Sequence, residues 1–227
     1  FYDKYGIDVE YVGHPLLDVI PGRQTVDRAA FLRENGLEDK PLVALLPGSR
    51  RMEVGKMLKQ MISIAGNFPG HQFVVAGAPS LDPDFYQSQL KDSGVRFVCN
   101  QTYPLLQLSS AALVTSGTAT LETALWNVPQ VVCYKGNWLS FQIAKRLVKI
   151  PYISLVNLIS GKPVVTELIQ DQLTPENLTR ELKRLLTPGP DRAMMLADYE
   201  HLKTLLGGPG ASARTAGLLA DYLRVSS

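Results

Sequence analysis

The sequence predicts an α/β fold: a Rossmann-like parallel sheet with helices on both faces, followed by C-terminal helices. Two observations carry this prediction. Apolar runs of strand length alternate with helical patterns from Leu42 to Val148, an order typical of a parallel sheet with helical crossovers. From residue 175 onward the apolar spacing is helical only, and clusters of proline and glycine break it at 187–190 and 207–210.

Composition is typical of globular proteins and argues against several functional classes. The 227 residues are 45% hydrophobic and 19% charged, and a formal net charge of +2 argues against nucleic-acid binding driven by bulk charge. Cys99 and Cys133 lie in or beside apolar runs and form no disulfide framework or metal motif, so we expect a reduced, cytosolic compartment. The chain lacks an initiator Met, and we expect it to be a piece of a longer protein.

Residues 1–24 are predicted to be a connector, the hinge from a missing N-terminal domain. Residues 9–12 have the pattern of a short strand, and Pro15 favours an extended conformation at His14. This histidine is either catalytic or a hydrogen-bonded loop residue. A helical pattern at 25–36, with Thr25 as the expected N-cap, then opens a domain that we assign to residues 25–162.

The first glycine turn follows a buried strand predicted at residues 42–46. Gly48, Ser49 and Arg50 lie on this turn, and a helix with one apolar face follows it. Arginine at a helix N-terminus opposes the helix dipole, an unfavourable arrangement that a bound anion would relieve. We therefore expect one of Arg50 and Arg51 to hold an anion; the alternative is a solvated pair on a loop.

The second glycine turn, Ser116-Gly117-Thr118, is the centre around which the chain is organised. An apolar strand at 111–115 ends there and a helix begins, which directs free backbone N–H groups and the positive end of the helix dipole at one point. Phosphate is a common occupant of such a point. Glu122 lies one turn into the helix, where its carboxylate would reach a sugar hydroxyl. The alternative is a plain strand–helix corner with Ser116 or Thr118 as N-cap.

A third loop follows the strand predicted at residues 129–134, where Tyr134 and Lys135 stand. Two more strands are predicted at 72–76 and 95–98. Because the carboxyl ends of parallel strands meet at one edge of a sheet, we expect the three loops to line a single ligand site.

Asp82-Pro83-Asp84 has the D-x-D spacing by which some sugar-nucleotide enzymes hold a metal. The same residues make an ordinary helix start, with Asp82 as N-cap and Pro83 at the first helical position. We favour the helix start and expect no metal.

A helix predicted at residues 138–148 has an outward face that joins aromatic and basic side chains. This pattern suits an acidic lipid surface, and the alternative is a solvated basic face. The residues of the face are Trp138, Phe141, Lys145 and Lys149. The apolar, irregular stretch at 151–161 follows, in which Asn157 either pairs with polar ligand atoms or ties down its own loop.

A nucleoside diphosphate fits the groups expected at the shared edge. Two helix N-termini, Arg50 and Lys135 suit the diphosphate, and Glu122 suits a ribose. The G-x-G-x-x-G fingerprint is absent, which argues against NAD, and the G-x-x-x-x-G-K-[ST] loop is absent, which argues against a P-loop ATPase.

Several motifs, in this order and spacing, resemble the lipid-A-disaccharide synthase family. They are Val12-Gly-His-Pro-Leu-Leu-Asp18, Leu46-Pro-Gly-Ser-Arg50 with Glu53, Thr115-Ser-Gly-Thr-Ala-Thr-Leu-Glu122, Ala144-Lys-Arg-Leu-Val148 and Ser154-Leu-Val-Asn-Leu158. The resemblance spans essentially the whole chain but only the C-terminal part of such an enzyme. It implies one half of a GT-B glycosyltransferase. The chain departs from the family at Arg51-Met52, where we would expect smaller residues.

The resemblance implies transfer of 2,3-diacylglucosamine from its UDP donor to 2,3-diacylglucosamine 1-phosphate, giving the lipid A disaccharide and UDP, without metal or cofactor. This chain would be the donor-nucleotide half, inactive alone, with the general base in the missing N-terminal domain. The implied substrate-binding residues are Gly48, Ser49, Arg50, Ser116, Gly117, Thr118, Glu122, Tyr134, Lys135 and Asn157.

The resemblance also implies a cytoplasmic enzyme, peripheral on the inner membrane. Helices within 163–227 would pack on the domain, on the missing half or on a partner subunit. Exchange of these helices would give a homodimer, with the break at 206–210 as hinge. Two other functions share the diphosphate and ribose contacts: another GT-B UDP-sugar transferase or epimerase, and a nucleotide-binding module without catalytic activity.

Overall fold

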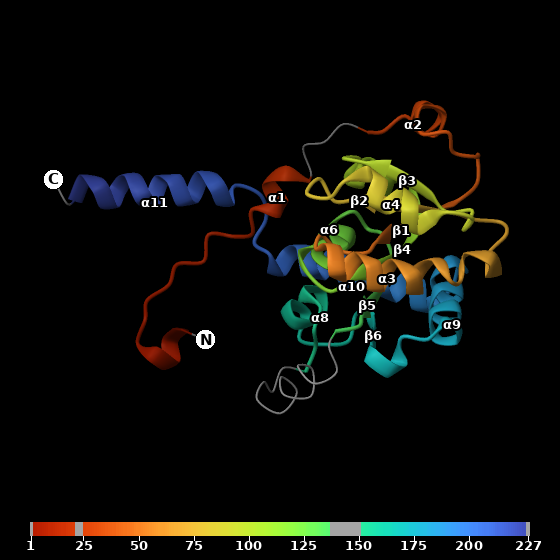
Figure 1. Ribbon diagram of the computed structural model, residues 1–227. Helices are drawn as coiled ribbons and strands as arrows, with labels where there is room; N and C mark the ends of the chain where they lie inside the picture. The colour runs from red at the N-terminus through yellow and green to blue at the C-terminus, as the bar shows by residue number, and fades with distance from the viewer. Residues whose placement is uncertain (1, 21–24, 137–150, 226–227) are drawn as a thin grey trace.

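The computed structural model describes residues 2–20, 25–136 and 151–225 (Figure 1). Its centre is a six-stranded parallel sheet in the order β3-β2-β1-β4-β5-β6. The strands are β1 (Leu42–Leu46), β2 (Gln72–Gly77), β3 (Arg96–Cys99), β4 (Ser109–Thr115), β5 (Gln130–Tyr134) and β6 (Thr166–Ile169). The predicted α/β fold class is confirmed, while the predicted helix at 138–148, with its aromatic and basic face, lies outside the described residues.

Helices cover both faces of the sheet because alternate side chains of each buried strand point to opposite sides. Val43 and Leu45 of β1 join the larger core, and Leu42, Ala44 and Leu46 join the smaller one. The larger core contains α3 (Arg51–Ile62), α4 (Pro83–Leu90), α6 (Thr118–Leu125), α9 (Pro175–Leu186) and α10 (Pro190–Leu205). The smaller core contains α2 (Arg28–Glu34) and α5 (Thr102–Leu108).

Local signals at several helix ends differ from those expected. Helix α2 is capped by Asp27, which accepts from the backbone N–H groups of Ala29 and Ala30, and not by Thr25. The stretch predicted to be irregular at 151–161 contains α8 (Leu155–Ser160), with Ser154 as its cap and the left-handed Gly161 at its end. Asp82 caps α4, as the helix-start interpretation predicted.

Two strand predictions need correction. Residues 9–12 form no strand, because no other described segment of the chain pairs with them. Val9 and Tyr11 are exposed. Conversely, β6 lies in the range 163–227 that we assigned to helices, so the sheet continues past residue 162. Its four residues, two of them polar, are too short a run to give a clear strand signal.

The remaining elements are short helical turns and the C-terminal helix. They are η1 (Tyr2–Tyr5), α1 (Leu16–Val19), η2 (Ala65–Asn67), η3 (Gln170–Gln172) and α11 (Ala211–Val225). None of the helices in the described part of the chain is both long and apolar enough to cross a membrane.

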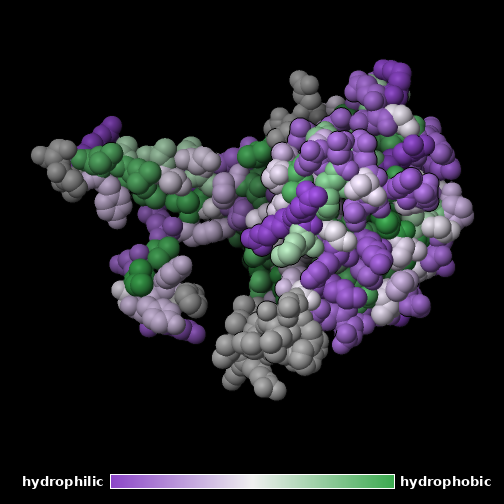
Figure 2. All heavy atoms as spheres, viewed as in Figure 1, coloured by the Kyte–Doolittle hydropathy of each residue, from purple (hydrophilic) through white to green (hydrophobic). Residues whose placement is uncertain are grey.

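Helix α11 extends away from the body of the molecule, as does the N-terminal segment (Figure 1). Its large apolar side chains, Leu219, Tyr222 and Leu223, are exposed. Figure 2 shows the hydrophobic surface of this helix on the arm that leaves the body. The predicted packing of this helix on another domain or subunit stays a prediction.

Asp18 joins the N-terminal connector to the start of α11. Its carboxylate accepts hydrogen bonds from the backbone N–H groups of Gly210, Ala211 (3.2 Å) and Ser212 (2.8 Å). The backbone and side chain of Ser212, followed by the backbone of Gly210, lower the pKa of Asp18 from 3.8 to about 2. Arg214 adds a bond to the carbonyl of Val12 (2.8 Å), so the connector and the helix form one unit.

We predict that Asp18→Asn loosens the start of α11. The pKa of Asp18 in the folded state lies below its unfolded value. The carboxylate therefore stabilises the junction fully above about pH 4, and this stabilisation is lost as the pH falls from 4 towards 2. At pH 7 the amide hydrogens of Gly210 and Ser212 should exchange roughly five- to tenfold faster in the variant. Asp221→Asn, on the exposed part of the same helix, is the control; equal exchange in both variants would contradict this account.

Candidate functional site

A pocket of about 300 Å³ lies at the carboxyl ends of β1, β2 and β4. The strand order reverses here, because β1 pairs with β2 on one side and with β4 on the other. Crevices at such reversals are the usual ligand sites of open parallel sheets. Predicted site residues that line the pocket together are Gly48, Ser49, Ser116, Gly117, Thr118 and Glu122.

The turn between β4 and α6 presents an uncapped helix N-terminus to the pocket. Gly117, and neither Ser116 nor Thr118, is the N-cap, and no side chain caps the helix. Gly117 has φ 153° and ψ −165°, a conformation that essentially only glycine adopts. Nothing lies within 4 Å of the position that a Cβ would take there. The first N–H groups of α6 are therefore accessible to an anionic ligand.

Ser116 anchors this turn to a distant loop. Its hydroxyl donates to the carbonyl of Ile153 (2.8 Å), and its backbone N–H donates to the carbonyl of Cys133 (3.4 Å). The hydroxyl hydrogen of Ser116 is therefore engaged within the chain, where it fixes the position of the turn. A contact between Ser116 and a phosphate stays a prediction.

Asn157 belongs to the same anchoring network and not to the pocket wall. It is 1% exposed, and its side chain donates to the carbonyl of Val165 and to Glu167 (both 2.9 Å) and accepts from the N–H of Val165 (2.9 Å). Glu167 also accepts from the backbone of Ile153 and Ser154. Of the two alternatives, the geometry supports the one in which Asn157 ties down its own loop.

Glu122 stands between the pocket and a second hollow of about 300 Å³. Pro79 and Thr102 line both hollows with it, and Asn100, Tyr103 and Pro104 complete the second. Burial raises the pKa of the Glu122 carboxyl, and a hydrogen bond with the Tyr103 side chain partly offsets this. Hydrogen-bond donors from a ligand would favour the charged form of this carboxylate.

The two arginines after Gly48 differ in their surroundings. Arg51 lies with its guanidinium carbon 4.5 Å from the centre of the Phe85 ring, a cation–π contact, and it does not line the pocket. Arg50 is the N-cap residue of α3; its side chain is exposed and forms no hydrogen bond or ion pair with the described residues. Arg50 does not line the pocket either, and its predicted contact with an anion stays a prediction.

The loops around the pocket brace one another. Ser80 donates its hydroxyl hydrogen bond to the carbonyl of Ser49 (3.2 Å), which joins the loops after β2 and β1. The buried Tyr86 hydroxyl accepts from the backbone N–H of Ala78 (3.0 Å). A Cβ on Gly77 would collide with the Phe97 ring, so glycine is required where β2 ends.

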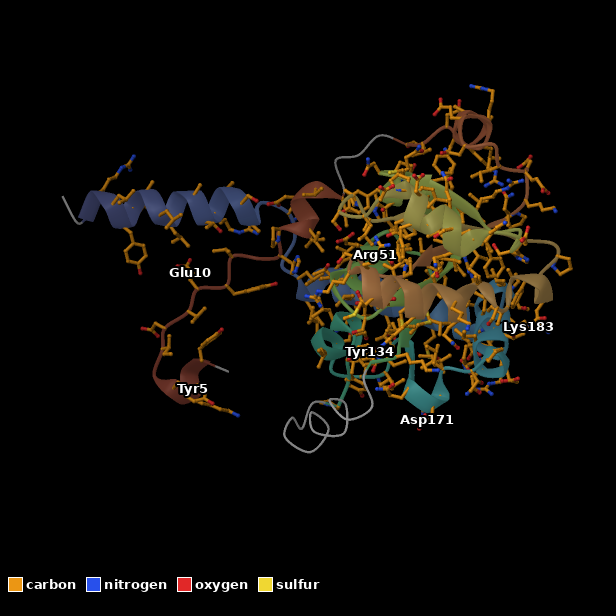
Figure 3. The ribbon with its side chains drawn as sticks, viewed as in Figure 1. Tyr5, Glu10, Arg51, Tyr134, Asp171 and Lys183 are labelled. Carbon is orange, nitrogen blue, oxygen red and sulfur yellow. The ribbon has the colours of Figure 1, made fainter. Side chains whose placement is uncertain are left out.

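Tyr134 and Lys135 lie at the end of β5, beside the end of β4, but neither lines the pocket. Figure 3 places Tyr134 at this strand end. Lys135 is exposed. Their predicted contribution to substrate binding stays a prediction.

His14 is held in its loop by two hydrogen bonds. Its side-chain Nδ1 accepts from the backbone N–H of Leu16 (3.2 Å), and its backbone N–H donates to the carbonyl of Leu206. These bonds support the interpretation of His14 as a loop residue.

A larger hollow of about 430 Å³ lies away from the turn, between β6, α9 and α10. Its charged residues are engaged within the chain: Arg184 pairs with Glu181 and Asp191, Asp198 pairs with Lys162 outside the hollow, and Glu167 accepts from Ser154 and Asn157. Among the described residues, no group of three or more His, Cys, Asp or Glu side chains is arranged to hold a metal ion. The uncapped turn thus makes the smaller pocket the better candidate site.

Several residues that line the candidate pocket have no predicted role in binding, among them Glu53 and Thr115. Glu53 belongs to one of the motifs that carry the family resemblance, but the motif alone predicts no chemical role for its carboxylate. Thr115 reads as the last residue of an apolar strand, and only the parallel register beside β1 brings it to the pocket.

Comparison with known proteins identifies the family. The lipid-A-disaccharide synthetase family matches residues 1–216. The chain belongs to this family. The lipid-A-disaccharide synthase of Syntrophus aciditrophicus is 40% identical over 233 residues, covering 99% of this chain. The chain spans 60% of the length of that relative.

Solved structures of GT-B glycosyltransferases share the fold. WaaG, a glycosyltransferase involved in lipopolysaccharide biosynthesis, matches with a TM-score of 0.54 at 16% identity, over 90% of this chain and 54% of WaaG. The calicheamicin glycosyltransferase CalG4 matches with a TM-score of 0.52 at 20% identity, over 89% of this chain and 44% of CalG4.

We predict that Asn157→Ala destabilises the chain by about 2–3 kcal/mol, because it leaves buried backbone and carboxylate groups without partners. Urea denaturation measures this loss. Asn67→Ala removes an exposed hydrogen bond to Thr179 and should cost less than about 1 kcal/mol. If Asn157→Ala were as stable as the Asn67 variant but bound UDP at least tenfold more weakly, the ligand-binding role would be right.

Proposed function

We propose that this chain is the donor-nucleotide half of a lipid-A-disaccharide synthase. The complete enzyme would transfer 2,3-diacylglucosamine from UDP-2,3-diacylglucosamine to the lipid monosaccharide acceptor, 2,3-diacylglucosamine 1-phosphate, and release UDP. Family membership supports the reaction. The observation that carries the nucleotide site is the uncapped N-terminus of α6, which opens into a pocket at the strand-order reversal.

The groups around the pocket suit the parts of UDP in order. The diphosphate would lie at the first N–H groups of α6, around Gly117 and Thr118, with Arg50 adding positive charge. The ribose would lie at Glu122, whose carboxylate accepts hydroxyl hydrogens. The uracil would enter the second hollow, beyond Glu122. This order requires only that one ligand crosses from one hollow to the next, past the residues they share.

The chemical role proposed for these groups is electrostatic. When the glycosidic bond to the donor breaks, negative charge develops on the departing diphosphate. N–H groups and a guanidinium that are already oriented at that charge stabilise the transition state more than the ground state. The acceptor hydroxyl also needs a general base, which we assign to a domain outside this chain.

The same proposal assigns the parts of the chain that would meet the other half of the enzyme. Residues 1–24 would be the connector to an N-terminal domain, and α11 would pack on that domain or exchange with a partner subunit in a homodimer. Supporting observations are the exposed apolar residues of α11 and the bonds that tie its start to Asp18.

We also propose that the enzyme works at the cytoplasmic face of the inner membrane as a peripheral protein. The support is the lipid nature of both substrates of the family reaction and the sequence pattern of Trp138, Phe141, Lys145 and Lys149.

Calorimetric titration with UDP tests the nucleotide site. We expect the wild-type chain to bind UDP, and Arg50→Ala and Glu122→Gln each to weaken binding about tenfold, the loss that accompanies one charge-assisted hydrogen bond. Arg51→Ala is the matched control, because Arg51 lies against Phe85, and should change the affinity less than threefold.

Two results would count against this assignment. If the wild-type chain did not bind UDP, the glycine turns would be structural corners. If Arg51→Ala weakened UDP binding as much as Arg50→Ala does, the loss of affinity would come from the change in overall charge and not from a specific contact. If the full-length enzyme bound UDP but did not synthesise the lipid A disaccharide, the alternative function of another UDP-sugar transferase or epimerase would be favoured.

A further inference from the structure

We propose that Glu53 and Thr115 form a subsite that recognises a hydroxyl group of the donor sugar. The inference rests on the proposed function, since it concerns the sugar that is attached to the nucleotide. Both residues line the pocket of about 300 Å³ that contains the β4–α6 turn. Thr115 is the last residue of β4, and Glu53 lies in the first turn of α3, the helix that follows the neighbouring strand β1.

Glu53 is a carboxylate without a partner. Among the described residues it forms no hydrogen bond or ion pair, although it occupies the third position of α3, from which a glutamate often bonds back to the N-cap backbone. Neither neighbouring arginine pairs with it. Its side chain lies against Gly48, where a Cβ would approach Glu53 Cδ to 2.7 Å, so glycine at φ 106° leaves the room that the carboxylate fills.

Thr115, at the end of β4, supplies a second unpartnered group to the same pocket. The residue is 3% exposed, and its Oγ1 is buried without any hydrogen-bond partner. A buried hydroxyl without a partner is unfavourable, and such groups are rare in folded proteins unless a ligand or water satisfies them. Thr115 follows Val114, which pairs with Leu46 at the end of β1, and it lines the same pocket as Glu53.

A sugar hydroxyl offers the donor and the acceptor that these two groups lack. It can donate its hydrogen to the Glu53 carboxylate and accept from the Thr115 hydroxyl. The diphosphate cannot take this place, because it has only acceptors to offer and its negative charge would be repelled by Glu53. A 2,3-diacylglucosamine donor keeps free hydroxyl groups on C4 and C6, and these are the groups that the subsite would recognise.

The test compares two ligands, UDP and UDP-N-acetylglucosamine, by calorimetry on the same chain. Glu53→Ala should raise the Kd for UDP-N-acetylglucosamine about tenfold and change the Kd for UDP less than threefold. Thr115→Val keeps the shape of the side chain and should also weaken only the sugar nucleotide, and Thr115→Ser should restore the affinity. Glu122→Gln is the matched control, because loss of a ribose contact should weaken both ligands equally.

Retained UDP binding reports that each variant is folded with its nucleotide site intact. Equal effects of Glu53→Ala on both ligands, or no effect on either, would overturn the subsite while leaving the nucleotide site in place. Failure of Thr115→Ser to restore affinity would remove the hydroxyl of Thr115 from the account. If the wild-type chain bound neither ligand, the proposed function itself would fail, and the subsite with it.

Discussion

The parallel pairing of β1 with β4 is the constraint on which the candidate site depends. Leu46 stands opposite Val114, so the turn after each strand opens at the same edge of the sheet. One turn brings Gly48 and the start of α3; the other brings Gly117 and the start of α6. Neither turn would make a pocket by itself. A site built on strand ends in this way keeps its geometry because β1 and residues 111–115 of β4 are buried beneath it.

A second set of constraints reaches the site from the far end of the chain. Ser116 is held by the carbonyl of Ile153, and Ile153 is held in turn by Glu167 on β6. The edge strand β6, in a range predicted to be helical, therefore helps to hold the central turn in place. In the same way, hydrogen bonds from Asp18 and Arg214 join the two segments that leave the body of the molecule.

Much of the fold and part of the candidate site could be predicted because they depend on local sequence patterns. The alternation of apolar runs and helical patterns predicted five of the strands, and a glycine after a buried strand predicted each turn of the site. The failures concern partners that are distant in sequence. Nothing near Ser116 reveals that its hydroxyl bonds to a residue 37 positions away, and nothing near Asn157 separates a ligand contact from a buried network. Thr115 looked like an ordinary strand residue until the register gave it a place.

The central claim is that a nucleoside diphosphate binds where β1 and β4 end. A crystal structure of the chain grown with UDP tests it most directly. The account predicts density for the diphosphate against the N–H groups of Gly117 and Thr118, with the ribose hydroxyls at hydrogen-bond distance from Glu122. UDP bound instead in the hollow between β6, α9 and α10, or bound at the strand ends with the ribose turned away from Glu122, would contradict it.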